Sequence, residues 1–379
     1  MKSIVAITDV FNELRGDPVR TGNALTSAGR RTVLLCVFAF AVLWNGIAVM
    51  PREGLQLFTD FSADPGLLST SHSWNGDAPL MFLLAHFAKV STLQQFILFS
   101  CILTTTTFAL LYLLSRTLET EAERLLALLL LLAHPISYIL LTWIGMLDAI
   151  TVLCTAVALF SRSRVLIVAA ATIGFCNHPA VALTIPAVQV LRRFSEPDRK
   201  SLSYIITAAL GIGTGFVCLH FLRASLHIDG LFRLQFILGK PLTEWMALNL
   251  KSFPSALYSF HFALWIPVLA MIVVFFRRNP KYYTAWLAVL LASWCIAFFT
   301  VDTTRVFALL TWAPTLHALL YTWRVRPDPA ARGEKFFRVS LASCAVFGWL
   351  APHFCVVNGV LYSPWFGQFV KYVLHVPGS

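Results

Sequence analysis

The sequence predicts an all-α, polytopic integral membrane protein with about eleven transmembrane helices. Of the 379 residues, 58% are hydrophobic and only 12% are charged, whereas about a quarter of a typical soluble domain is charged. The mean hydropathy is +0.74. The apolar residues also fall into runs close to the roughly 20 residues that cross a bilayer core. Together these observations exclude a soluble enzyme, a disordered chain and a disulfide-linked scaffold.

The first apolar run follows a basic segment, residues 1–30, that we expect in the cytoplasm. Because the run is long enough to span and lacks a small-residue cleavage site, we expect an uncleaved anchor, not a signal peptide. Residues 31–379 then form a single polytopic membrane domain. Its clear spans are expected near residues 31–50, 96–115, 124–143, 146–161, 202–222, 260–276, 283–300, 306–323 and 339–357.

The stretch 164–191 is a longer apolar run that Asn177-His178-Pro179 interrupts. Proline lacks an N–H and disfavours helix at the residue before it. Arginines stand before and after the stretch, so both of its ends carry cytoplasmic-type charge. We therefore expect a tight hairpin of two short helices with His178 at its tip, which completes the eleven spans.

The positive charge sets the orientation. The chain has 29 Lys and Arg against 18 Asp and Glu, a net charge of +11. In this topology 21 of the 29 basic residues lie on the side of the N-terminus. That bias predicts a cytoplasmic N-terminus. As a separate expectation, we place the multi-pass protein in the cell inner membrane. The basic residues flank apolar runs, so the predicted partner is the lipid bilayer and no nucleic acid.

Two outer segments, 51–95 and 223–259, are expected to hold interfacial helices. Residues 79–90 are too few to span, yet too apolar to lie in water, which is typical of a helix along the membrane surface. In 223–259, Leu, Phe and Trp alternate with charged residues, among them Arg233 and Lys240.

Ionisable residues from distant segments collect on the outer side, where their cost at membrane depth suggests function. Several have structural alternatives. Asp64 precedes Pro65 in a turn-starting pair, and Asp148 follows Gly145 as a possible N-cap. His178 stands at a break, and Asp302 either caps a helix or pairs with Arg305. The residues concerned are Asp60, Asp64, Asp77, Asp148, His178, Asp302 and Arg305.

Other motifs receive structural interpretations. Gly211-Ile-Gly-Thr-Gly215 lies inside a span with no preceding strand, so we expect helix packing and not a phosphate loop. His134-Pro135 predicts a kink with a satisfied imidazole. The eight cysteines and ten histidines show no metal-ligand spacing. No cofactor is predicted, and acids alone do not specify a divalent metal.

The first outer loop carries a resemblance. After one span, the loop opens with Asp60, and Asp77-Ala78-Pro79-Leu80 then runs into the short apolar stretch that ends at Lys89. This resembles the GT-C superfamily of polytopic glycosyltransferases, which use polyprenyl-phosphate sugars and include protein O-mannosyltransferases and aminoarabinose transferases. The motif match covers residues 31–95, and the rest matches by topology only. Phe61 follows Asp60 where the family often has a second acid, and Ala78 replaces the first Pro of a Pro-Pro-Leu step.

The resemblance implies transfer of a sugar from a polyprenyl-phosphate donor to a glycan, lipid or protein acceptor on the outer face. It implies that Asp60, with Asp64 as alternate, is the catalytic base or positions the acceptor, and that Asp77 and Lys89 belong to the substrate site. A guanidinium binds phosphate oxygens in bidentate fashion, so we expect Arg305 to hold the donor phosphate.

Two other functions remain open. A polysaccharide polymerase or ligase of the Wzy/EpsG kind also handles polyprenyl-linked glycans and would depend on Arg305 more than on Asp60. A lipid or solute transporter would tolerate substitution of Asp60 but not of polar residues in mid-span. The sequence shows no matching broken helices in its two halves, which disfavours the transporter.

Overall fold

The computed structural model describes residues 27–70, 74–196, 199–228, 232–325, 332–357 and 360–362. Within these residues the chain is all-α, apart from one antiparallel hairpin of β1 (Cys355–Val357) and β2 (Val360–Tyr362). The expected all-α class is confirmed. Most of the expected cytoplasmic segment, residues 1–26, lies outside the described residues.

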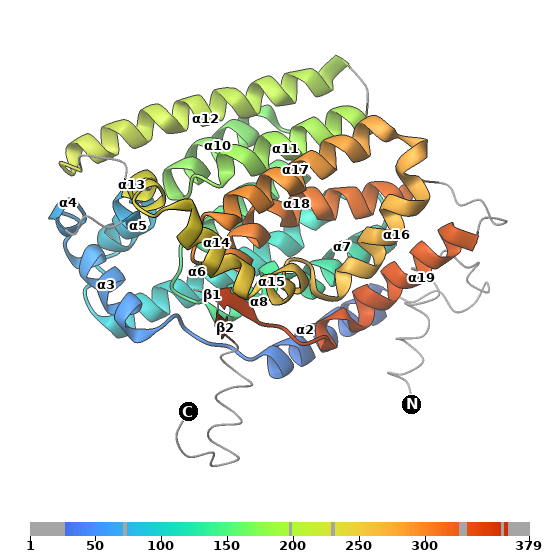
Figure 1. The fold of residues 1–379 in the computed structure, drawn as a ribbon, viewed down its shortest axis with the longest axis horizontal. Helices are drawn as coiled ribbons and strands as arrows, with labels where there is room; N and C mark the ends of the chain where they lie inside the picture. The colour runs from blue at the N-terminus through green and yellow to red at the C-terminus, as the bar shows by residue number, and fades with distance from the viewer. Residues whose placement is uncertain are drawn as a thin grey trace, which may run out of the picture.

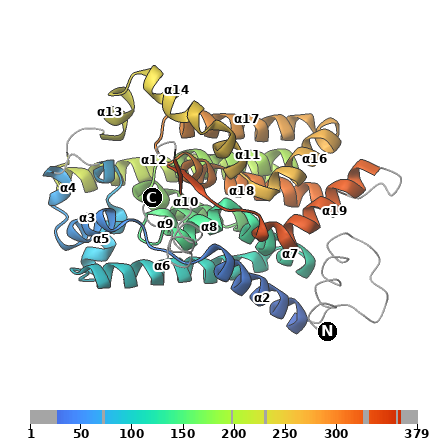
Figure 2. The same cartoon turned by 60° about the horizontal axis from the view of Figure 1, so that its bottom comes forward.

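The helices of the main bundle run for the most part along the long axis of the molecule (Figures 1 and 2). They are α2 (Ser27–Asn45), α6 (Leu93–Leu114), α7 (Glu121–Ala133), α8 (Pro135–Thr142), α9 (Asp148–Phe160), α10 (Arg164–Asn177), α11 (Val181–Ser195), α12 (Arg199–Ser225), α16 (Trp265–Phe275), α17 (Pro280–Phe298), α18 (Thr303–Arg324) and α19 (Arg332–Phe347).

Two segments form short helices. The segment 51–95 forms α3 (Arg52–Ala63), α4 (Leu67–Thr70), η1 (Trp74–Asp77) and α5 (Leu80–Phe87), while 223–259 contributes α13 (Phe232–Leu238), α14 (Leu242–Lys251) and α15 (Phe253–Ser259). The short helices α3, α4, α5 and α13 gather at one end of this bundle, on the left in both views, and α14 and α15 lead from there toward its middle.

Local sequence explains where several helices begin. Thr92 and Gln95 form a reciprocal capping box at the start of α6. Thr120 caps α7, and Asn279 caps α17 ahead of Pro280, which fits the first turn because its missing N–H has no helical partner. The N-termini of these helices can therefore be predicted from four or five consecutive residues.

Three described helices are long and apolar enough to cross a membrane: Leu93–Thr117, Leu202–Ser225 and Pro280–Phe298. Two bent pairs raise the number to five. One is α7 with α8, which bend by 60° at His134-Pro135, and the other bends by 85° between Ser259 and Phe262. The kink expected at His134 is present, but the imidazole is only half satisfied: Nδ1 accepts the Ile136 N–H at 3.1 Å, and Nε2 has no hydrogen-bond partner among the described residues.

Two expected spans end early. The run at 31–50 is helical only to Asn45, and Ala48 and Met50 then exchange backbone hydrogen bonds with the segment at Ile144. The run at 339–357 was wrong as one helix, since α19 stops at Phe347, the short 3-10 helix η5 (Gly348–Leu350) follows, and the chain then becomes extended and enters β1. Apolar composition predicts burial, but it does not distinguish a helix from a buried strand.

Large hydrophobic side chains remain exposed on the outer faces of several helices. On α12, Phe216 and Phe221 are 64% and 69% exposed, and on α16 Val273 is 82% exposed. Contiguous apolar surface of this kind needs a partner other than water. Together with the five candidate spans, it indicates a membrane protein.

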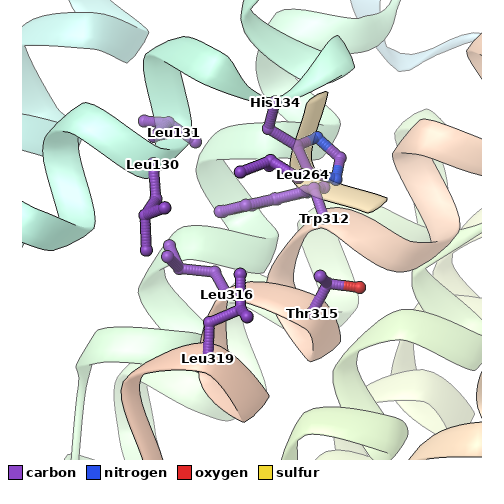
Figure 3. A pocket seen from close by; sticks show the side chains of 8 residues that line it. All are labelled: Leu130, Leu131, His134, Leu264, Trp312, Thr315, Leu316 and Leu319. Atoms are coloured by element: carbon purple, nitrogen blue, oxygen red, sulfur yellow. The ribbon is translucent and has the colours of Figure 1, made fainter. Parts of the chain in front are cut away.

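A small cavity lies in the core where the α7–α8 bend meets α18 (Figure 3). Its volume of about 10 Å³ admits roughly one water molecule. Among the described residues, His134 Nε2, Trp312 Nε1 and Thr315 Oγ1 line it or face it without a hydrogen-bond partner. The cavity is too small to hold a substrate, so the functional site must lie elsewhere.

Candidate functional site

A buried ionic triad joins the start of α9 to the start of α18. Arg305 donates from Nε and Nη2 to the two carboxylate oxygens of Asp148, at 2.8 and 3.0 Å, and from Nη1 to Asp302 at 3.0 Å. All three residues are at most 9% exposed. A buried ion pair is stable only when its hydrogen bonds are made, and here each guanidinium nitrogen has a carboxylate partner.

The turn before α9 aims Asp148 at this partner. Gly145 has φ +110°, a left-handed conformation that favours glycine, and a Cβ there would lie 2.6 Å from Leu55. Asn177, at the end of α10, donates to Leu147 O and to Thr151 Oγ1 and so fixes the first turn of α9. Asp148 is the first residue of α9 and makes no capping bond, so of its two alternatives the N-cap role is not the one it takes.

The start of α18 is held from three directions. Thr303 donates to Asn249 of α14, and Thr304 hydrogen-bonds Ser259 of α15 at 2.6 Å. The Val356 N–H of β1 donates to Thr304 Oγ1. Asp302 occupies the N-cap position but its side chain makes no cap, because it accepts from Arg305. Of the two alternatives for Asp302, the ion pair with Arg305 is therefore the one that is present.

A second ionic group lies beside the triad and brings in the first outer loop. The Asp77 carboxylate accepts the backbone N–H of Arg233 at 2.7 Å, and its other oxygen lies 4.0 Å from Arg223 Nη2. The Arg233 guanidinium lies 3.5 Å from His178 Nε2. These contacts connect η1, the end of α12, α13 and the joint between α10 and α11.

The two groups influence each other electrostatically. Burial, followed by the charges of Arg233 and Arg305, lowers the pKa of His178 well below its usual value, so the imidazole is neutral. Burial lowers the pKa of Arg233 to about 10, although Asp77 opposes this shift. Arg233 therefore stays charged at neutral pH in a largely desolvated place.

The remaining predicted residues lie apart from these groups. Asp60, on α3, accepts from Gln56 at 2.9 Å, and Asp64 accepts the Gly66 N–H in a turn, as its pairing with Pro65 suggested. Lys89 follows α5 and lines an open groove of about 440 Å³ beside the end of α3. In the described part of the chain, no hydrogen bond or ion pair links their side chains to the triad.

The eight predicted site residues thus divide into two sets. Five come together in the closed cluster (Asp77, Asp148, His178, Asp302 and Arg305), and three lie near or beside the open groove (Asp60, Asp64 and Lys89). Sequence reasoning did not single out Arg233 or Arg223 as site residues. Both are basic residues of the expected outer side. The sequence feature that could have pointed to them is that the outer acids need cations nearby.

The cluster has the chemistry of an anion site and not of a metal site. It concentrates three arginines and a neutral histidine around carboxylates that are already engaged. No group of three His, Cys, Asp or Glu residues that could hold a metal ion exists among the described residues. Comparison of the chain with protein-family models, with characterised proteins and with solved structures finds no match.

Proposed function

We propose that the protein is a multi-pass membrane glycosyltransferase that moves a sugar from a polyprenyl-phosphate donor to a glycan, lipid or protein acceptor on the outer membrane face. The observation that supports this most is the buried arginine–histidine–aspartate cluster at the same end of the bundle as α3, α4 and α5. Charged groups at such depth are costly and are typically retained for function. The first-loop resemblance to the GT-C superfamily supplies the reaction type.

In this proposal eleven elements cross the membrane, with α7 and α8 together forming one of them. The protein lies in the cell inner membrane, and its N-terminus is in the cytoplasm. The ion pairs support this topology. Each of the eight among the described residues joins two residues that the charge distribution assigns to one side. For example, Arg324 pairs with Glu123 at one end, and Arg305 with Asp148 at the other.

Asp60 serves as the base or acceptor-positioning group. It is half-buried on α3, a helix that also leads toward the open groove lined by Lys89. An acceptor entering from the outer face would meet this groove first. The lipid-linked donor would approach from the bilayer, toward the cluster.

A polysaccharide polymerase or ligase is the second candidate, because Arg305 is buried and makes three hydrogen bonds to carboxylates, whereas Asp60 is half-buried and its side chain, among the described residues, hydrogen-bonds only Gln56 in α3. The two functions differ in which of these residues is essential. They also differ in product, since a polymerase extends chains of finished repeat units and a transferase adds one sugar.

The test is mass spectrometry of surface glycans from a strain that lacks the gene, complemented with wild type or with Asp60→Asn. The transferase proposal expects one sugar to disappear, and to return with wild type but not with Asp60→Asn at equal expression. Shortened chains with intact repeat units, rescued by Asp60→Asn, support the polymerase instead. Unchanged glycans in every strain contradict both and support a transporter.

A further inference from the structure

The hydrogen bonds around His178 fix which of its ring nitrogens carries the proton. Its Nδ1 accepts the backbone N–H of Ala180 at 3.1 Å, as His134 Nδ1 accepts the Ile136 N–H in the other His-Pro turn. A nitrogen that accepts a hydrogen bond has no hydrogen of its own. In the neutral ring the proton is then on Nε2, which becomes a donor.

Arg233 presents a second donor to the same point. Its Nη1 lies 3.5 Å from His178 Nε2, and a guanidinium has no acceptor. Two N–H groups therefore face one another, and the described residues place no acceptor between them. Asp77 does not resolve this, because its carboxylate binds the Arg233 backbone N–H and lies near Arg223.

The usual candidate for an anion ligand, Arg305, is already occupied. Each of its three nitrogens donates to Asp148 or Asp302. Within the described residues, by contrast, the guanidinium of Arg233 forms no ion pair within 4.0 Å. Of Arg305 and Arg233, therefore, it is Arg233 whose guanidinium has no carboxylate partner among the described residues.

We propose that an anionic phosphate oxygen binds between His178 Nε2 and Arg233 Nη1, and that this oxygen belongs to the polyprenyl-phosphate donor. An oxygen can lie about 2.8 Å from both nitrogens, the usual length of a charge-assisted hydrogen bond. This inference rests on the proposed function for the source of the phosphate. It transfers the role of phosphate ligand from Arg305 to Arg233 and makes the triad a positioning scaffold.

Two substitutions isolate the two donors with little change elsewhere. Arg233→Gln removes the guanidinium but keeps the backbone N–H that Asp77 accepts. His178→Asn keeps a side-chain acceptor for the Ala180 N–H, as Asn does in turns, and removes the Nε2 donor. Lys240→Gln is the matched control, because Lys240 carries the same charge near α13 but pairs with the exposed Glu244.

The experiment measures binding of a polyprenyl monophosphate, and separately of inorganic phosphate, to the full chain in nanodiscs of neutral lipid. Nitrogen-15 histidine NMR reports the Nε2–H signal, which His178→Asn assigns. We expect the polyprenyl phosphate to shift this signal, and Arg233→Gln and His178→Asn to weaken its affinity about 10- to 100-fold. Lys240→Gln should bind as wild type does.

An unmoved histidine signal at saturating polyprenyl phosphate, or wild-type affinity in Arg233→Gln, overturns the inference. Should Arg233→Gln fail to fold, Arg233→Lys applies the same test, because Lys keeps the charge but loses the planar fork. Equal affinity for inorganic phosphate and polyprenyl phosphate overturns the lipid-linked source. Phosphate binding that depends on Arg233, without sugar transfer from any donor, supports the phosphate site and contradicts the transferase function. Sugar transfer at the wild-type rate by Arg233→Gln supports the transferase function and contradicts the phosphate site.

Discussion

Single residues in this protein take roles that depend on partners far away in the sequence. Asp148 and Asp302 both stand at helix starts, where local rules favour capping. Their carboxylates instead bind Arg305, which is 157 residues from Asp148. For Asp302 the ion-pair partner is only three residues away and is visible in the local sequence. For Asp148 the local sequence cannot decide between a cap and an ion pair, because the partner comes from a distant segment.

Removing one carboxylate of the triad at a time should show that the Arg305–Asp148 pair contributes more to stability than the Arg305–Asp302 pair. Asp148→Asn breaks the bidentate pair and leaves Arg305 with a single buried carboxylate partner, so we expect a loss of about 3–5 kcal/mol in unfolding free energy. Asp302→Asn removes one hydrogen bond and should cost less than half as much. Melting of the purified protein in detergent compares the two, and equal losses would contradict this geometry.

Lys89 has an unfavourable backbone conformation. Its φ of +57° is left-handed, and the N–H groups of Lys89 and Val90 close the end of α5 on His86 O and Ala85 O. Glycine is the usual residue at such a C-terminal position. We expect Lys89→Gly to stabilise the protein by about 1 kcal/mol, while Lys89→Ala, which keeps the strain, should not.

The same pair of variants tests function. If Lys89 contacts substrate, both variants lose activity although only one gains stability. A strained residue retained at the cost of stability is typical of functional sites. Full activity in Lys89→Gly would remove Lys89 from the proposed site.

Between elements, the closest packing is that of α10 against α12. A Cβ on Gly211 would lie 2.6 Å from Ala171 Cβ and 2.8 Å from Val168 O, and the glycine carbonyl accepts from Thr172. Gly213 has nothing within 4 Å of that position. The helix-packing interpretation of this glycine motif is therefore confirmed.

This difference predicts opposite effects on stability for the same glycine-to-alanine substitution at two positions of α12 that are only two residues apart. Gly211→Ala should destabilise by about 1–3 kcal/mol through overpacking. Gly213→Ala should stabilise by roughly 0.5–1 kcal/mol, because alanine is the better helix former. Thermal melting in detergent measures both, and a loss in Gly213→Ala would mean that this face contacts another surface.

The sequence predicted the elements well where the signal was local. Prolines located the bend at His134 and the joint at His178, and the basic flanks located the ends of α10 and α11. The error at 339–357 arose where tertiary contacts decide, since β1 is fixed by Thr304, 52 residues away. The pairing of Asp302 with Arg305, three residues apart, was among the expected alternatives. The pairing of Asp148 with Arg305 and the place of Arg233 depend on distant segments and were therefore out of reach.

For the whole molecule, buried neutral histidines couple stability to pH. Burial lowers the pKa of His178 well below its usual value and that of His353 to about 4. The unfolded chain binds their protons near pH 6.5, so it holds more protons than the folded chain below that pH, and stability falls as pH falls. At pH 5 the neutral His353 should cost roughly 2 kcal/mol, and His178 acts in the same direction.

Melting temperatures between pH 7.5 and 5 measure this dependence. His178→Asn should flatten the profile, because asparagine does not titrate. A melting temperature that rises on acidification would contradict neutral burial of these groups.

The segregation of ion pairs to two ends gives the proposed topology its sharpest consequence. Lys251 is exposed on α14, at the end of the bundle that holds the cluster, and Arg277 is exposed in the turn between α16 and α17, at the other end. The exposed native cysteines, Cys36, Cys218 and Cys295, are first replaced by alanine. In intact cells, a membrane-impermeant thiol reagent should then label Lys251→Cys but not Arg277→Cys, and permeabilisation should expose both. Labelling of Arg277→Cys alone in intact cells would invert the topology and place Asp60 and the cluster in the cytoplasm. The positive-inside rule makes that inversion costly, because it would move most of the basic residues across the membrane.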